Sequence, residues 1–194
     1  MTIADKELNV KEDGYYLAAG NDATVKLAEY SGNSKAANLA DGHFDTNKDA
    51  LTFYGDIKEL DAEGYVEDIA LYGNNKDNVI KAGSGNDTLW GGNGGNDTLI
   101  GGEGEDTFIY KQGNGNDEVQ NAGNGDCIKL DGIDVSWCTK VCNELFVGND
   151  VKFEFADGGS FLVKNGQAEG ITYEVEGKQY SVVKTASGSE WKVK

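Results

Sequence analysis

Three consecutive copies of a motif rich in glycine and aspartate lie in the middle of the chain and decide its fold. They read AGSGNDTLW at residues 82–90, GGNGGNDTLI at 91–100 and GGEGEDTFI at 101–109. Each copy consists of a glycine-rich turn, an aspartate, one further residue and an apolar residue. Glycine supplies the positive φ angles and the bare backbone that a tight turn requires. The motif therefore predicts one turn and one very short strand per copy.

The period continues on both sides of these copies. An apolar residue recurs at steps of 9 to 11 residues, at Leu51, Leu60, Ile69, Val79, Leu89, Leu99, Phe108, Val119 and Ile128. Neither a helical period nor strict strand alternation extends so far. The period is also too short for an ankyrin, tetratricopeptide or leucine-rich repeat. Because so short a unit cannot bury its own apolar side chain, neighbouring units must stack into a solenoid.

Weaker copies of the motif end in Asp77–Asn78–Val79, Asp117–Glu118–Val119 and Asp126–Cys127–Ile128. Over roughly residues 72–130 the chain resembles the RTX, or haemolysin-type, calcium-binding nonapeptide repeat, G-G-x-G-x-D-x-U-x. The resemblance implies an all-β fold built on a right-handed parallel β-roll, with calcium ions in two rows between stacked turns. It also implies a secreted bacterial protein that leaves the cell unfolded by type I secretion.

The chemistry of the turns agrees with this resemblance. Calcium takes six to eight oxygen ligands from carboxylates and backbone carbonyls, and one turn supplies too few, so two stacked turns must share each ion. If each unit is half a coil, a turn stacks on the next but one. Asp77, Asp97 and Asp117 then lie along one side of the roll, and Asp87, Asp106 and Asp126 lie along the other. We expect calcium sites between the pairs 77/97, 97/117, 87/106 and 106/126.

The predicted metal-binding residues are the motif aspartates and the glycines of their turns. They are Asp77, Gly83, Gly85, Asp87, Gly92, Gly94, Gly95, Asp97, Gly102, Gly104, Asp106, Gly113, Gly115, Asp117, Gly123 and Asp126.

Four segments are expected along the chain. Residues 1–50 form an irregular β-rich flank, and residues 51–71 form metal-poor coils that have lost their turn glycines and cap one end of the roll. Residues 72–132 form the calcium-binding roll. Residues 133–194 contain an alternating stretch at 150–155 and turn signals at Asn165–Gly166 and Glu176–Gly177. They predict a hairpin-rich cap that protects the open edge of the roll.

The charge balance excludes some partners. Thirty-four acidic residues face 17 basic ones, and the formal net charge is −17. Such a charge argues against nucleic acid and against anionic membrane surfaces. It also destabilises the compact state unless counter-cations bind, although a merely soluble acidic surface is the alternative. No apolar stretch approaches the roughly 18 residues of a membrane span, and Met1–Asn9 has no apolar signal-peptide region.

We expect a non-enzymatic function, because the sequence contains neither H-E-x-x-H nor G-x-S-x-G. Ordering the backbone costs about 1–2 kcal/mol per residue. Calcium at a concentration tenfold above its dissociation constant stabilises the folded state by about 1.4 kcal/mol per site. The hypothesis is a chain that is unfolded inside the cell and folded outside it, on binding extracellular calcium.

The module would stabilise an exported adhesin or surface protein, located outside the cell or on its surface. Its partners would be calcium, the type I secretion machinery and an unknown extracellular partner, with no nucleic acid and no membrane insertion by this segment. One alternative is the non-catalytic C-terminal part of a secreted hydrolase or toxin. Another is a glycan- or protein-binding module, for which Trp90, Tyr110, Trp137 and Trp191 are the candidate aromatic residues.

Three cysteines, Cys127, Cys138 and Cys142, are an odd number and do not make a disulfide framework. The C-x-x-x-C spacing of Cys138 and Cys142 leaves a disulfide, half of a zinc site and two unpaired thiols as alternatives.

Overall fold

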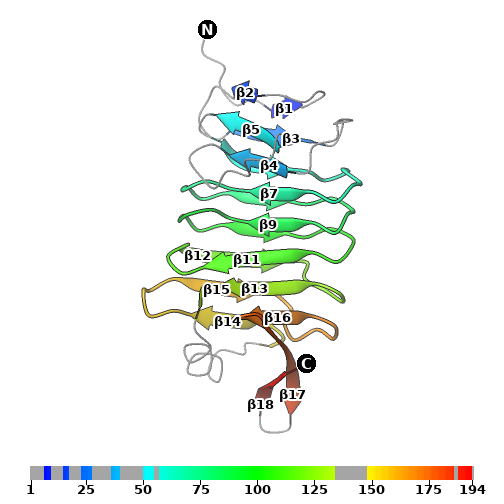
Figure 1. Cartoon of the computed structure of the whole chain (residues 1–194), viewed down its shortest axis with the longest axis vertical. Coiled ribbons are helices and arrows are strands. Elements are labelled where there is room, and N and C mark those ends of the chain that lie inside the picture. The colour runs from blue at the N-terminus through cyan, green and yellow to red at the C-terminus, as the bar shows by residue number, and fades with distance from the viewer. Residues whose placement is uncertain are drawn as a thin grey trace.

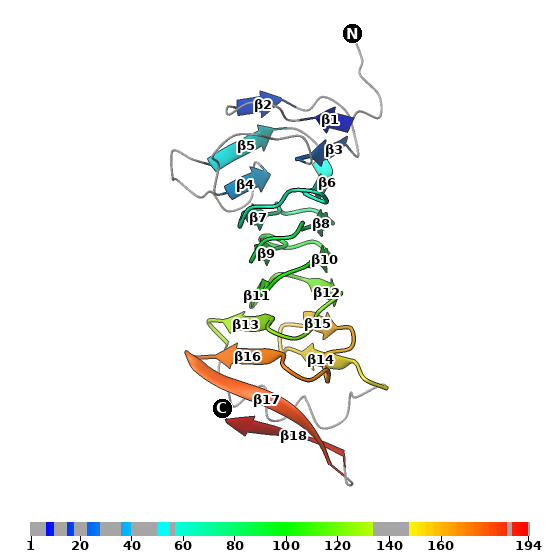
Figure 2. The ribbon, with the colours of Figure 1, turned by 90° about the vertical axis from the view of Figure 1, so that its right-hand side faces the viewer.

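The computed structural model describes residues 7–9, 15–17, 23–27, 36–39, 50–54, 57–133, 148–185 and 188–193. Every regular element among them is a β-strand, and the strands form two facing sheets that run along the long axis of the molecule (Figures 1 and 2). The described residues contain no helix with the length and apolarity of a membrane span. The predicted all-β parallel roll is confirmed.

The first sheet has eight strands and the second has ten. In spatial order the first contains β1 (Glu7–Asn9), β3 (Ala23–Lys26), β6 (Ile57–Asp61), β8 (Val79–Lys81), β10 (Thr98–Ile100), β12 (Asn116–Gln120), β15 (Ser160–Val163) and β14 (Val151–Glu154). The second contains β18 (Gly188–Val193), β17 (Lys178–Thr185), β16 (Thr172–Val175), β13 (Cys127–Asp131), β11 (Thr107–Lys111), β9 (Thr88–Trp90), β7 (Ala70–Tyr72), β4 (Ala36–Leu39), β5 (Ala50–Tyr54) and β2 (Tyr15–Leu17).

From β6 to β13 the chain alternates between the two sheets. Each strand pairs in parallel with the next but one, so that Thr98 of β10 lies opposite Val79 of β8 on one side and Glu118 of β12 on the other. One motif is therefore half a coil, as the sequence predicts. In the three-residue strands β8 and β10 only the central residue is buried, whereas the five-residue strands β11, β12 and β13 each bury two residues.

The core is a double ladder of completely buried side chains, one from each half-coil. Leu60, Ile80, Leu99, Val119 and Val163 line the first sheet, and Leu71, Leu89, Phe108, Ile128 and Tyr173 line the second. Burying one such side chain contributes about 1.5–3 kcal/mol. A single half-coil gains too little to fold alone, and the ladder holds together by stacking.

Two positions of the predicted period are wrong by one or two residues. The register places Ile80, not Val79, opposite Leu99, and it places Leu71, not Ile69, opposite Leu89. Val79 is half-buried on the outer face of its strand, whereas Ile69 is buried at the end of the preceding turn. In these two coils Asn78 or Ile69 stands where the other coils have the motif aspartate. Counting from an aspartate to the apolar residue therefore does not locate the core residue in them.

The N-terminal coils also depart from simple stacking. Strand β4 lies between β5 and β7, so Leu51 of β5 pairs with Ala37 of β4 and not with β7. The apolar period that starts at Leu51 therefore does not correspond to an uninterrupted series of stacked half-coils.

The C-terminal strands first extend the roll and then end it. Strand β15 adds in parallel to β12, and β16 adds in parallel to β13. The antiparallel strands β14, β17 and β18 follow outside them. Tyr110 packs in this region between Phe155 and Phe161, at ring-centroid distances of 4.7 and 4.9 Å. Positive φ angles at Glu176 and Gly177 form the predicted hairpin turn between β16 and β17.

The register can be tested with two neighbouring substitutions. We expect Ile80→Ala to cost about 2–5 kcal/mol of unfolding free energy, because it leaves a cavity in the core ladder. Val79→Ala, at the outer face, should cost about 1 kcal/mol or less. Urea unfolding in saturating calcium measures both values. A larger loss in Val79→Ala than in Ile80→Ala would contradict the observed register.

Candidate metal centre

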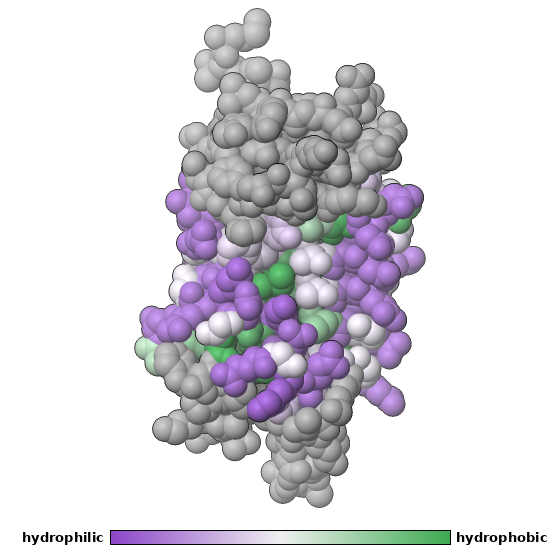
Figure 3. Space-filling model, viewed as in Figure 1, coloured by the Kyte–Doolittle hydropathy of each residue, from purple (hydrophilic) through white to green (hydrophobic). Residues whose placement is uncertain are grey.

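The turns stack in two rows, one along each edge of the roll. The first row comprises residues 73–78, 91–97 and 112–117, which lead into β8, β10 and β12. The second row comprises residues 62–69, 82–87, 101–106, 121–126 and 164–171, which lead into β7, β9, β11, β13 and β16. On the face seen in Figure 3, hydrophilic residues gather along both lateral edges, with a paler and partly apolar strip between them.

Glycine allows the backbones of successive turns to approach closely. A Cβ atom on Gly102 would lie 1.6 Å from the carbonyl oxygen of Gly83, and one on Gly115 would lie 1.7 Å from that of Gly95. Carbonyl oxygens of one turn therefore face bare Cα atoms of the next turn, and no side chain fits between them. The seam between stacked turns is lined by backbone oxygen.

In the second row both carboxylate oxygens of each motif aspartate accept hydrogen bonds. Asp87, Asp106 and Asp126 are all at most 3 % exposed. One oxygen accepts an N–H from the preceding turn, and the other accepts an N–H from a glycine of the same turn. The first set of bonds comes from Ile69, Asp87 and Asp106, at 2.9, 2.9 and 2.8 Å, and the second from Gly83, Gly102 and Gly123, at 3.3, 3.0 and 2.8 Å.

The first row repeats only half of this pattern. Asp97 Oδ1 accepts the N–H of Asn78 at 2.7 Å, and Asp117 Oδ1 accepts the N–H of Asp97 at 3.0 Å. The Oδ2 atoms of both aspartates are buried and have no hydrogen-bond partner among the described residues. Both side chains are only 2 % exposed.

The predicted alignment of Asp77 is wrong by one position. Asn78 lies opposite Asp97, while Asp77 lies beside it and accepts the N–H of Asn96 at 2.8 Å in an exposed position. Asn78 takes the place of the motif aspartate because its amide oxygen accepts a hydrogen bond from a residue four positions earlier, Asn74. Asp87, Asp97, Asp106, Asp117 and Asp126 stand in the rows as predicted.

A second ladder of side-chain hydrogen bonds was not expected from the sequence. The residue before each motif position accepts an N–H from the following turn: Asp68 from Asn86, Asn86 from Glu105, Asp77 from Asn96 and Asn96 from Asn116. The recurring Asn–Asp pair at 86–87, 96–97 and 116–117 was the available signal. Because this ladder runs opposite to the aspartate ladder, each turn is held from both sides.

Burial raises the pKa of all five motif aspartates. For Asp97, the negative charge of Asp117 raises the pKa further, while the N–H of Asn78 opposes the shift. For Asp117, burial outweighs the hydrogen bonds from Asp97 that lower the pKa. Without a cation, the fold therefore favours the neutral form of these carboxyl groups.

The residues fit a hard cation such as calcium. The seams offer carboxylate and carbonyl oxygens, which are the ligands that calcium prefers, and two buried carboxylate oxygens lack a partner in the described structure. The part of the chain that the structure describes has no cluster of three or more His, Cys, Asp or Glu side chains. Backbone carbonyls must therefore complete the ligand set. When bound, calcium would supply the positive charge that offsets the buried carboxylates.

The predicted glycine ligands all lie in the stacked turns, but not in equivalent surroundings. A Cβ atom added to Gly94, Gly113 or Gly123 would meet no heavy atom within 4 Å. One added to Gly92, Gly95, Gly102, Gly104 or Gly115 would lie directly against a carbonyl of the preceding turn.

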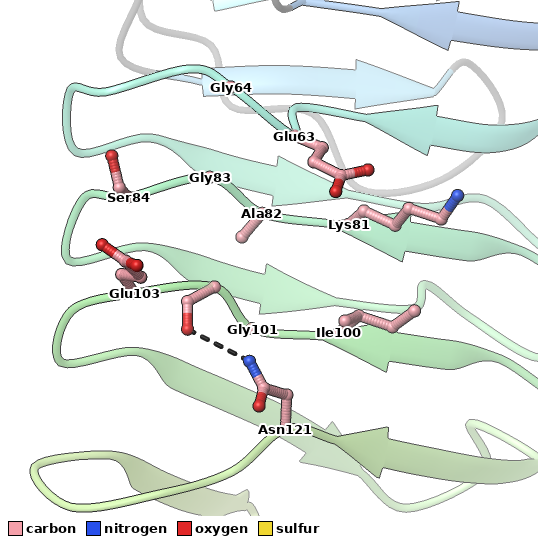
Figure 4. Close-up of a pocket in the computed structure, with 11 residues that line it drawn as sticks. Glu63, Gly64, Lys81, Ala82, Gly83, Ser84, Ile100, Gly101, Glu103 and Asn121 are labelled. Carbon is pink, nitrogen blue, oxygen red and sulfur yellow. Dashed lines mark hydrogen bonds between the residues drawn. The ribbon is translucent and has the colours of Figure 1, made fainter.

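A groove of about 650 Å³ runs beside the second row. Its walls are residues 81–84 and 100–103, with Glu63 and Asn121 towards its ends, and the Asn121 amide donates to the carbonyl of Gly102 at 3.2 Å (Figure 4). None of the five buried aspartates lines this groove. It is thus a surface feature distinct from the seams between the turns.

The roll, with its rows of buried aspartates and glycine-lined turns, defines a class of calcium-binding β-solenoid. Comparison with known families agrees: residues 72–108 and 92–119 match the family model of the RTX calcium-binding nonapeptide repeat (4 copies). Residues 72–119 of this chain are therefore RTX calcium-binding repeats, as the resemblance implied. Repeats of this family bind calcium, are structural and not catalytic, and occur in secreted bacterial proteins. No curated protein matches the chain.

Several sequence-based candidates lie elsewhere. Cys138, Cys142 and Trp137 fall outside the described residues, as does the side chain of Trp191. Cys127 is half-buried on β13. The aromatic residues proposed for glycan binding include Trp90 and Tyr110, which are only 3 % and 0 % exposed. Lys111 covers Trp90, with Nζ 4.4 Å from the ring centroid.

The raised pKa values predict a pH dependence in the absence of metal. A carboxyl group whose pKa is higher in the folded than in the unfolded state loses its contribution to stability as the pH rises through the folded-state pKa. In chelator we therefore expect a lower melting temperature at pH 8 than at pH 5. Saturating calcium should remove this decline, because it stabilises the ionised form. Thermal melts followed by circular dichroism measure both; stability that rises with pH in chelator would contradict the assignment.

Substitutions at two glycines with similar φ angles distinguish the cost of close contact between turns from the cost of a left-handed backbone conformation. Gly113 and Gly115 have φ angles of 87° and 94°, but only Gly115 faces a carbonyl. Gly113→Ala should cost about 1–2 kcal/mol from the left-handed conformation alone. Gly115→Ala should cost clearly more, because the turns must move apart. Urea unfolding in calcium tests the difference, and equal losses would exclude close stacking at Gly115.

Proposed function

We propose that this chain contains a folding and stability module that orders on binding extracellular calcium, within an exported adhesin or surface protein. The observation that carries the proposal is the set of five buried aspartates in two rows between carbonyl-lined turns. Buried carboxylates without compensating charge are strongly unfavourable. A cation of the extracellular medium is the natural compensation.

The charge of the whole chain supports a switch. A net charge of −17 opposes the compact state, and the half-coils of β8 and β10 each contribute only one buried strand residue. A ligand that binds only the folded state stabilises it by RT ln(1 + [L]/Kd), which is about 1.4 kcal/mol per site at tenfold the Kd and nearly nothing at a hundredth of it. The low calcium of a cytosol would leave the chain unfolded for type I secretion, and the higher calcium outside would fold it.

We propose calcium sites between Asp97 and Asp117, between Asp87 and Asp106, and between Asp106 and Asp126, with the turn glycines supplying carbonyl ligands. The fourth predicted pair, Asp77 and Asp97, is left out, because an amide, Asn78, stands opposite Asp97. Residues 72–132 are the proposed calcium-binding part. Residues 51–71 and 133–194 are its proposed caps, and residues 1–50 are the flank.

The test is a calcium titration of the chain followed by far-UV circular dichroism, with magnesium as the ionic control. We expect a cooperative gain of β signal and of melting temperature with calcium and little change with magnesium, which is smaller and demands stricter octahedral geometry. Asp97→Ala and Asp106→Ala should weaken the response. Glu176→Gln removes one exposed charge in the β16–β17 turn and should leave it unchanged.

A chain that is equally folded and equally stable in chelator and in calcium would overturn this proposal. A response as large in magnesium as in calcium would also overturn it, since general charge screening would then explain the stabilisation.

A further inference from the structure

The two rows of turns do not satisfy their carboxylates equally. In the second row, each of the three motif aspartates receives two backbone N–H bonds. In the first row, Asp97 and Asp117 each receive one backbone N–H bond. While both carboxyl groups are ionised, each keeps one buried oxygen that no described donor reaches. All five side chains are at most 3 % exposed, so accessibility to water does not explain the difference.

Turn length accounts for the difference at Asp97, whereas Asp117 lacks the second donor although Gly113 lies four residues before it. In the second row, Gly83 and Gly102 each lie four residues before the aspartate and point an N–H at its Oδ2. The turn at 91–97 contains one extra residue compared with those turns. There the free Oδ2 of Asp97 lies against the Cα of Gly91, where a Cβ would come within 2.0 Å of it. Gly101 lies in a similar way against Asp106 Oδ2, at 2.6 Å from an added Cβ, but there Gly102 also donates its N–H. In the longer turn this donor to the aspartate is missing.

The surroundings close the first-row seam around this pair. The Tyr110 hydroxyl donates to the carbonyl of Gly115 at 2.9 Å, and the Asn114 amide donates to the carbonyl of Gly92. Along the row, Asn78 stands before Asp97 and Phe161 stands after Asp117. The first row therefore contains a single adjacent pair of buried motif aspartates, and the negative charge of the nearby Asp77 raises the pKa of Asp97 further.

We infer that one calcium ion bound between Asp97 and Asp117 carries most of the calcium dependence of folding, whereas the second-row turns hold their geometry through backbone N–H bonds and gain less from calcium. This inference rests on the proposed function, and it assigns most of the calcium dependence of folding to the first row of turns. The Asp97–Asp117 pair has the stronger requirement for a cation because, when both carboxyl groups are ionised, no described N–H compensates for their free Oδ2 atoms.

Isosteric substitutions in the full chain test the difference. In chelator, Asp97→Asn and Asp117→Asn should raise the melting temperature above that of the unsubstituted chain, because a neutral amide avoids the free-energy cost of either burying an ionised carboxyl group or protonating it. Asp87→Asn and Asp106→Asn should lower it, because an amide cannot accept two N–H bonds in the same way. In the calcium titration, the midpoint should rise about tenfold or more in the first pair. It should shift by clearly less in the second pair.

Terbium luminescence gives a second readout that does not depend on folding in chelator. Tyr110 lies beside the first-row seam, so it should sensitise a terbium ion bound there. We expect Tyr110→Phe, Asp97→Asn and Asp117→Asn to remove the same component of tyrosine-excited terbium emission, displaceable by calcium. Asp106→Asn should retain this component.

Equal shifts of the calcium midpoint in the two pairs would overturn the inference, as would a Tyr110-dependent emission that survives Asp97→Asn. Both results leave the proposed function standing if the unsubstituted chain still needs calcium to fold. If the unsubstituted chain folds equally well in chelator, the proposed function itself fails, and the two failures are thereby distinguished.

Discussion

The hydrogen bond from the backbone N–H of one turn to the aspartate carboxylate of the next is the interaction on which the roll depends. It fixes the distance between successive coils, as between Asp87 and Asp106 and between Asp97 and Asp117. At that distance, carbonyl oxygens press against the Cα of the following turn, so glycine is required at positions such as Gly102 and Gly115. The same bond draws each carboxylate out of water, where a negative charge needs compensation.

Two kinds of compensation are present in one fold. Backbone donors satisfy the second-row carboxylates. The first-row pair lacks the second donor, and we propose that a cation compensates its charge. The core ladder supplies apolar burial all along the roll, but each half-coil adds only a few buried side chains. Stability is therefore distributed over many small contributions, and the electrostatic contribution decides the balance. Such a balance suits a segment that must be unfolded in one compartment and folded in another.

The sequence was sufficient for the repeat, the all-β roll and the pairing of each half-coil with the next but one, because the Gly–Asp motif sets both turn and strand. The sequence-based alignment was wrong by one residue at Asp77 and Val79. There the register shows that an amide, Asn78, takes the place of the motif carboxylate. The sequence also did not predict the insertion of β4 between β5 and β7, since strand order there depends on tertiary contacts. The difference between the rows required atomic positions: residue types alone do not tell which N–H reaches a carboxylate.

The most direct test of the account is native-state hydrogen exchange of the backbone amides of Asp87, Asp97 and Asp106, which donate to the aspartates of the following turns. If a bound cation allows the roll to fold, calcium gives these amides the protection of globally folded structure and chelator removes that protection. Slow exchange of the same amides in chelator, at the rates found in calcium, would contradict the claim that a bound cation is what allows the roll to fold.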